Sequence, residues 1–174
     1  MKEILLAISL LSIQLGDAYE NASTFQIQKK WLGFRAAKSK EISETEKRLN
    51  IKLPEDYKTF LKITNGFSAS STLKPTFMEI ESVDFLKNFD TIIINAWKDA
   101  GDFETANILE RSILIAGKDQ EQYFLLIPPN DENGKWRYWK FASWQAGENE
   151  FENLDSYFKN VLKFYEKENT QTIN

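Results

Sequence analysis

Three short apolar segments in the second half of the chain place the strongest constraint on its fold. They read RSILIAG, QYFLLIP and KWRYWKF, and the polar sequences KDQE and PNDENG separate them. Short runs rich in β-branched and aromatic residues, bounded by Asp, Asn and Gly, are typical of strands joined by turns. The sequence therefore predicts three consecutive antiparallel strands between residues 111 and 141.

The third of these segments predicts a sheet that is covered on both faces. Side chains alternate between the two faces of a strand, so each face of this segment receives aromatic residues. We therefore expect other elements to pack on both sides. The two sets are Trp136, Tyr138 and Lys140 on one face, and Arg137, Trp139 and Phe141 on the other.

Helical patterns precede the strands. In EISETEKRLN, Ser43 and Glu46 form a capping-box pattern, in which each side chain satisfies the other residue's backbone N–H. We expect a helix that begins at this box and buries Ile42 and Leu49. It should end near Asn50, because Asn tolerates the left-handed conformation found at helix ends.

A second helix is predicted in KLPEDYKTFLKITNGF, residues 52–67. Pro54 suits the first turn of a helix, where its missing N–H costs nothing. The pair Asn65 and Gly66 is expected to close the helix, since glycine reaches positive φ without strain. One face should be buried, and at helical spacing it contains Tyr57, Phe60, Leu61 and Thr64.

The remaining segments complete a single α+β domain, an antiparallel sheet with helices packed on it. TFMEIESVDFLKNF predicts a short strand that passes into a helix. DTIIINAWKDAG predicts a further helix ended by Gly101, although TIIIN alone also has strong strand propensity. After the strands we expect an acidic loop, a last helix and a frayed tail over residues 169–174. The apolar stripe of the last helix contains Leu154, Phe158, Val161, Leu162 and Tyr165.

The N-terminal sequence MKEILLAISLLSI allows two interpretations. It could be a short export signal, but Glu3 cancels the charge of Lys2 and no convincing cleavage site follows. It is also too short to span a bilayer. A buried helix explains it as well, so we favour a cytoplasmic protein without membrane contact. The apolar residues at helical spacing are Ile4, Ile8, Leu11 and Leu15.

Composition excludes several kinds of chemistry. The chain has no Cys and no His, which removes disulfides, thiol nucleophiles, imidazole bases and the usual zinc ligands. Enzymatic activity is therefore disfavoured, and no cofactor or metal is expected. A carboxylate-based enzyme would need two convergent acidic groups, one with a raised pKa. The pairs Glu148 with Glu150 and Asp131 with Glu132 are the candidates.

Charge is distributed unevenly along the chain. Residues 99–155 contain 5 basic and 12 acidic side chains, a net charge of −7. Such a segment is either a solvated face or a docking surface for a basic partner, whose encounter it would accelerate. Nucleic acid is not an expected ligand, because phosphates require a basic patch. The only basic cluster contains Lys29, Lys30, Arg35, Lys38 and Lys40. We interpret it as solvated surface.

The order of these motifs resembles the SUKH superfamily, the Smi/Knr-type domain. The resemblance rests on a capped helix, LPEDY, FL and NGF, followed by strands that end in FASWQAGE, with WLGF where such domains often begin. It implies a domain over residues 31–168, with residues 1–30 as a helical extension of the same domain. The matching positions are Ile42, Glu46, Leu49, Leu53, Pro54, Tyr57, Phe60, Leu61, Asn65, Gly66, Tyr123, Leu125, Trp139, Phe141, Trp144, Gly147 and Glu148.

The resemblance implies a binding function. Bacterial members resemble immunity proteins that bind and block a toxin, and fungal members are regulators of cell-wall synthesis that act as interaction hubs. The first role predicts a toxin partner with a basic surface, and the second a regulatory scaffold without one; the oligomeric state stays open. The expected partner-binding residues are Asp99, Asp102, Glu104, Asp131, Glu132, Trp136, Glu148 and Glu150.

Overall fold

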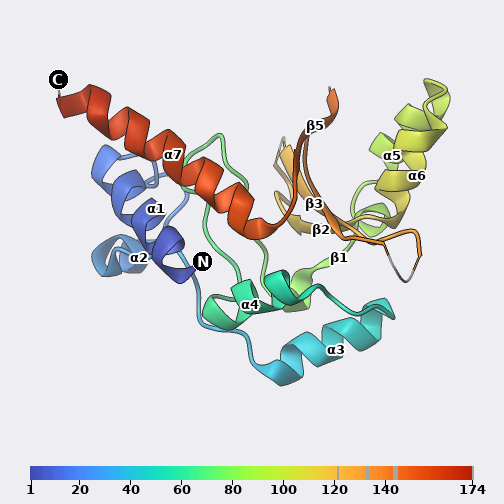
Figure 1. Ribbon diagram of the computed structural model, residues 1–174, viewed down its shortest axis with the longest axis horizontal. Helices are drawn as coiled ribbons and strands as arrows, with labels where there is room; N and C mark the ends of the chain where they lie inside the picture. The colour runs from blue at the N-terminus through green and yellow to red at the C-terminus, as the bar shows by residue number, and fades with distance from the viewer. Residues whose placement is uncertain (121, 132–133, 143–144, 174) are drawn as a thin grey trace.

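A computed structural model describes residues 1–120, 122–131, 134–142 and 145–173. Its centre is one antiparallel sheet in the order β1-β2-β3-β4-β5, in which each strand pairs with the next in the chain (Figure 1). The predicted α+β class is therefore confirmed. The strands are β1 (Asp84–Phe85), β2 (Ile113–Ala116), β3 (Gln122–Ile127), β4 (Arg137–Ala142) and β5 (Gln145–Phe151).

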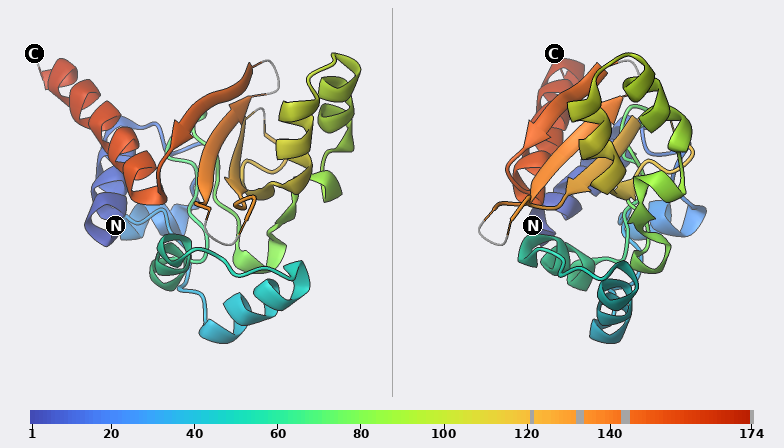
Figure 2. Two further views of the ribbon diagram at one scale, coloured as in Figure 1. Left: turned by 45° about the vertical axis from the view of Figure 1, so that its right-hand side comes forward. Right: turned by 90° about the vertical axis from the view of Figure 1, so that its right-hand side faces the viewer.

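Helices surround the sheet on several sides (Figures 1 and 2). Two of them, α5 and α6, form a hairpin beside one face, and α7 runs past the other face towards α1. The helices are α1 (Lys2–Leu15), α2 (Thr24–Lys29), α3 (Ser39–Leu49), α4 (Glu55–Ile63), α5 (Thr91–Asp99), α6 (Phe103–Arg111) and α7 (Leu154–Ile173). Two short 3-10 turns, Ile80–Ser82 and Leu86–Asn88, flank β1.

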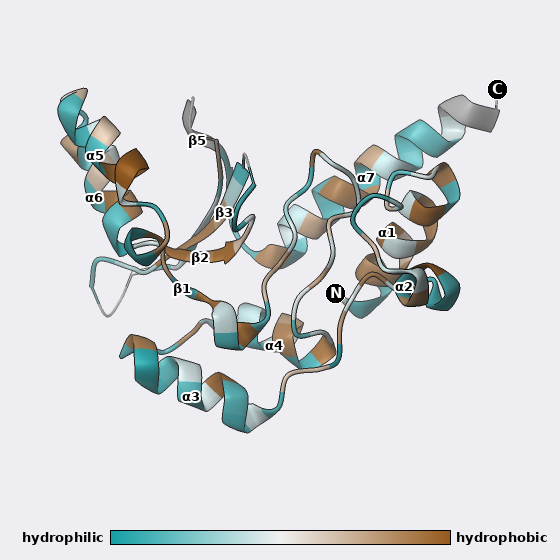
Figure 3. Cartoon of the chain, turned by 180° about the vertical axis from the view of Figure 1, so that it is seen from behind, coloured by the Kyte–Doolittle hydropathy of each residue, from teal (hydrophilic) through white to brown (hydrophobic). Residues whose placement is uncertain are grey.

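The sheet confirms the three predicted strands and the expectation that both faces are covered. Tyr138 and Trp139 point to opposite faces of β4, and both are almost fully buried. On the Tyr138 side, Phe124 contacts Tyr157 of α7, with ring centroids 4.4 Å apart. On the Trp139 side, Phe141 contacts Trp97 of α5. The hydropathy colouring in Figure 3 agrees, because buried β2 is brown throughout whereas outlying α3 is mostly teal.

The capping box predicted at Ser43 is wrong. Helix α3 begins four residues earlier, at Ser39, and the carboxylate of Glu41 accepts the backbone N–H of Lys38. The carboxylate of Glu46 instead turns inward and accepts the backbone N–H of Leu53 at 3.0 Å. The helix ends as predicted, because Asn50 adopts the left-handed conformation. Ile42 and Leu49 are buried, as expected.

The predicted end of the second helix is also wrong. Helix α4 stops at Ile63, and Thr64 is already extended. The side-chain amide of Asn65 donates to Glu81, and its carbonyl accepts the N–H of Ile80. Gly66 does have positive φ, but its role is to let the chain pass close to the ring of Phe34. The expected buried face is confirmed, and Pro54 lies one residue before the helix.

Four further segments depart from the expectations. The predicted acidic loop before the last helix is wrong in part, because residues 145–151 form β5, which pairs with β4. Helix α6 had no counterpart in the sequence assignment, whereas α5 is confirmed as a helix. The segment 76–89 contains β1 between two 3-10 turns rather than a strand leading into an α-helix. Helix α7 continues through residues 169–173, which the sequence assigned to a frayed tail.

The apolar N-terminal segment forms α1, which packs against α7 at the other end of the sequence (Figure 1). Leu5 and Ile8 are fully buried, and the hydroxyl of Ser9 accepts the backbone N–H of Leu32. Of the predicted stripe, Ile8 is fully buried, whereas Ile4, Leu11 and Leu15 are partly buried against the core. Within the described residues, no helix is long and apolar enough to span a bilayer.

Candidate protein-interaction surfaces

The acidic residues at the α5–α6 turn lie together. Asp99 ends α5, Asp102 precedes α6, and Glu104 lies in the first turn of α6. Asp99 and Glu104 are exposed, and Phe103 between them exposes 63% of its surface. We call Asp99, Asp102, Phe103 and Glu104 the α5–α6 tip. It presents one exposed aromatic ring, with the exposed residues Asp99 and Glu104 close to it in the chain.

The carboxylate of Asp102 also has a structural task. Its Oδ1 atom accepts the backbone N–H of Thr105 at 3.0 Å, and its Oδ2 atom accepts the Thr105 hydroxyl at 2.8 Å. These hydrogen bonds lower the pKa of Asp102, since they stabilise the charged form. Asp102 therefore fixes the start of α6, and Asp99 and Glu104 supply the charge that is free for a partner.

The remaining predicted residues lie elsewhere. Asp131 is exposed in the loop between β3 and β4, and Trp136 is half-buried against the core just before β4. The carboxylate of Glu150 pairs with the Nε atom of Arg137 at 2.9 Å. Figures 1 and 2 show this loop at the end of the sheet opposite to the α5–α6 tip. Glu132 and the side chain of Glu148 lie outside the described residues.

The geometry offers little for carboxylate catalysis. Within the part of the chain that the structure describes, every carboxyl group whose pKa departs from its ordinary value has a lowered pKa, and a general acid needs a raised one. The Arg35 guanidinium, for example, lowers the pKa of Glu41 through a 2.7 Å hydrogen bond. Among the described residues, no group of three or more acidic side chains could hold a metal ion.

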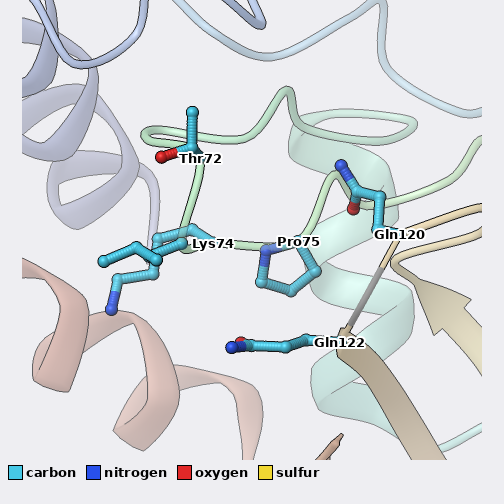
Figure 4. A pocket seen from close by; sticks show the side chains of 6 residues that line it. Thr72, Lys74, Pro75, Gln120 and Gln122 are labelled. Carbon is cyan, nitrogen blue, oxygen red and sulfur yellow. The ribbon is translucent and has the colours of Figure 1, made fainter.

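A small polar pocket lies between the loop that follows Ser71 and the start of β3 (Figure 4). Its volume is about 120 Å³, below the range of ordinary ligand sites. Gln120 lines it but uses its side-chain carbonyl to accept the N–H of Thr76. The ammonium of Lys74 lies 5.0 Å from the ring centroid of Phe164 on α7. We therefore interpret this pocket as part of the packing between the loop and the sheet rather than as a ligand site.

A larger hollow surrounds Trp31, on the side of the molecule formed by α1 and α2. One hollow has a volume of about 540 Å³ and is lined by Trp31, Phe25, Phe34 and Arg35, among others. A second hollow, also lined by Trp31, has a volume of about 360 Å³ and is lined further by Lys2, Leu6 and Ile63. We call the two hollows together the Trp31 groove.

The Trp31 groove is apolar inside and basic at its rim. Phe25 exposes 66% of its surface, and Trp31 packs edge-on against Phe67, with ring centroids 5.8 Å apart. The ammonium of Lys29 lies 5.7 Å from the ring centroid of Phe25. Lys2, Lys29 and the adjacent Lys30 are exposed and make no ion pair within the described parts of the chain. The lysines read as solvated surface thus border an aromatic groove.

Sequence analysis missed this groove, although it contained a usable signal. Phe25, Trp31 and Phe34 are interspersed with Lys29, Lys30 and Arg35 over eleven residues, 25–35. Aromatic residues among basic ones are a recurrent feature of binding surfaces. What the sequence could not provide is the position of Leu6 and Ile63, which α1 and α4 bring to the same groove.

Taken together, the described fold and surfaces define a class, the single-domain α+β proteins in which helices cover an antiparallel meander. Within that class, the chain belongs to the SMI1 / KNR4 family (SUKH-1), which it matches over residues 36–167. The suspected family is thereby confirmed, and this family is known for protein–protein interaction. No curated protein matches the sequence. Helices α1 and α2 and most of the Trp31 groove precede the matched range.

Proposed function

We propose that this chain is a cytoplasmic, non-catalytic binding protein that neutralises a toxin domain by covering a basic surface on it. Membership of a family that is generally non-catalytic and known for protein–protein interaction supports a binding role. The observation that carries the finer proposal is the α5–α6 tip. There, exposed Asp99 and Glu104 flank an exposed phenylalanine.

The tip has the chemistry of an interface centre for a basic cleft. An aromatic side chain supplies most of the apolar area at such a centre, and flanking carboxylates orient a cationic partner. Because Asp102 fixes the first turn of α6, Phe103 and Glu104 are presented on a rigid element. Binding of this kind would block a toxin by exclusion of its substrate, without any chemical step.

The experiment is an affinity capture from the organism's own lysate and secreted fraction, with identification by mass spectrometry. The bait is the wild-type chain or a variant with Asp99→Asn, Phe103→Ser and Glu104→Gln. The control variant carries Glu20→Gln and Glu166→Gln, which are also exposed acidic positions. We expect a toxin domain with the wild type and the control, but not with the tip variant.

Other results would contradict the proposal. Capture of a cell-envelope or signalling assembly, equal for the tip variant and the control, would assign the chain to the regulatory role. Capture of a toxin that the tip variant retains would keep the immunity role and move the interface to the β3–β4 loop, with Asp131 and Trp136.

A further inference from the structure

Two surfaces of the chain have complementary chemistry. The Trp31 groove is an aromatic hollow that Lys2 lines and Lys29 borders through its contact with Phe25, whereas Arg35, which also lines it, is paired with Glu41 and Glu81. The α5–α6 tip is a protruding aromatic ring bordered by exposed carboxylates. A cation-rimmed hollow and an anion-flanked ring match in both shape and charge.

The hollow is also large enough for the ring. Its larger part has a volume of about 540 Å³, which lies within the range of pockets that hold whole small molecules, about 300–1,000 Å³, and a single phenyl ring is smaller than such a ligand. Phe25 and Trp31 would provide the aromatic contacts, while Lys2 and Lys29 would face the carboxylates of the tip. Exposed apolar area of this kind marks an interaction site when polar residues surround it.

One molecule cannot satisfy this match by itself. Helices α1 and α2, which carry the groove, lie on the opposite side of the molecule from the α5–α6 tip, along its longest axis (Figures 1 and 2). Only a second molecule can therefore bring a tip into the groove. Such a contact either repeats head-to-tail into an open chain or a ring, or closes into a two-fold dimer in which the tip of each molecule enters the groove of the other.

We propose that the Trp31 groove binds the α5–α6 tip of a second copy of this chain. Phe103 enters the hollow beside Trp31, and Asp99 and Glu104 pair with Lys2 and Lys29 at its rim. The test of this inference needs only the purified chain and no toxin, but both occupants would use the α5–α6 tip, so self-association and toxin binding should compete for it. The proposed contact assigns a role to the segment before residue 36, which the family match does not cover.

The first measurement is sedimentation velocity of the full chain over a wide range of concentrations. We expect the weight-average sedimentation coefficient to rise with concentration and to fall when salt is added. The groove variant Phe25→Ser with Lys29→Glu, and the tip variant Phe103→Ser with Glu104→Lys, should each weaken association about tenfold or more. Phe25 and Phe103 are both largely exposed, so both variants should fold.

The matched control keeps the same kinds of substitution away from both surfaces. Leu73→Ser with Lys163→Glu replaces one exposed apolar and one exposed basic side chain, and we expect it to associate like the wild type. Circular dichroism and a thermal melt check that every variant is folded.

A mixing experiment distinguishes a contact between tip and groove from a contact between two like surfaces. The groove variant retains a functional tip, and the tip variant retains a functional groove. Each alone should stay monomeric, whereas an equimolar mixture should form a dimer and nothing larger, because the mutated ends stop growth. A wild type that is monomeric at every concentration would overturn the proposal. So would association that both variants retain, or a mixture that stays monomeric.

Discussion

Asp56 shows how one side chain can acquire a role that its sequence position does not reveal. By sequence, Asp56 is an acidic residue at the positive end of a helix. In the structure its Oδ1 atom accepts the hydroxyl of Tyr138 at 2.6 Å, and its Oδ2 atom accepts the backbone N–H of Leu154 at 3.1 Å. One carboxylate thus connects α4, β4 and the start of α7.

This connection gives a prediction for stability. Asp56→Ala leaves the Tyr138 hydroxyl and the Leu154 N–H without their partner, and each such loss costs about 1–3 kcal/mol. We expect the free energy of unfolding to fall by about 2–4 kcal/mol in urea denaturation. Glu55→Ala, one residue earlier, removes only an exposed ion pair with Lys58 and should leave the midpoint unchanged. Equal effects would contradict the assigned role.

Tyr123 gives a prediction for alkaline pH. Burial, together with a 2.9 Å hydrogen bond to the carboxylate of Asp90, raises its pKa to about 12. The native state therefore holds this proton more tightly than the unfolded state, whose tyrosine pKa is about 10. The contribution to stability is complete below about pH 10 and is lost as the pH rises towards about 12.

The measurement is the pH dependence of unfolding by urea between neutral pH and pH 12. We expect the free energy of unfolding of Tyr123→Phe to fall less steeply with rising pH than that of the wild type. Tyr19→Phe, at an exposed position, should show the same fall as the wild type. A decline that is identical in all three proteins would show that Tyr123 does not contribute.

At the scale of whole elements, the sequence correctly predicts strands with a distinct apolar pattern. It does not predict structure that depends on contacts with residues distant in the chain. The strands β2, β3 and β4 alternate or are continuously apolar, so their pattern alone identifies them. Strand β5, QAGENEF, is largely polar, and it is a strand because β4 offers it a paired edge. The false capping box at Ser43 has the same cause, since Leu53 provides the better partner for Glu46.

The turn between β2 and β3 provides a prediction at this scale. Gly117 has a φ of +88°, and an added Cβ would lie 2.0 Å from the carbonyl oxygen of Gln122. Gly101 has a similar φ of +83° but open space around it. Gly101→Ala should therefore cost about 1–2 kcal/mol through backbone strain alone. Gly117→Ala should cost about 3 kcal/mol or more, because backbone atoms must also move.

Thermal or chemical denaturation of the two alanine variants compares these costs directly. The difference between them isolates the steric contact from the conformational strain, since both positions have positive φ. Equal losses of unfolding free energy in the two variants would mean that the β2–β3 turn can accommodate the added Cβ without a further loss of stability.

At the scale of the whole molecule, the candidate sites were predictable in part. The clustering of acidic residues in the sequence predicts a common surface for Asp99, Asp102 and Glu104. In the structure, these residues are adjacent at the turn between α5 and α6. Asp131 and Trp136 were grouped with them, yet the strand directions separate the two sets along the sheet. The Trp31 groove required long-range contacts between α1, α4 and the segment after α2, and no local pattern encodes these.

The charge of the acidic segment predicts how salt affects partner binding. If the α5–α6 tip steers a basic toxin, the association rate should fall steeply as salt rises, while the dissociation rate changes much less. Surface plasmon resonance with the captured toxin would measure both rates. The control variant Glu20→Gln with Glu166→Gln should retain the salt dependence, and an association rate independent of salt would indicate an apolar interface.

The packing of α1 against α7 has a consequence for synthesis on the ribosome. Residues 15 and 154 are separated by nearly the whole chain, and translation proceeds at about 5–20 residues per second. The buried side of α1, with Leu5 and Ile8, therefore waits on the order of ten seconds for its partner. During that interval the nascent chain carries an uncovered apolar helix, so chaperones that recognise such segments should bind it until α7 emerges.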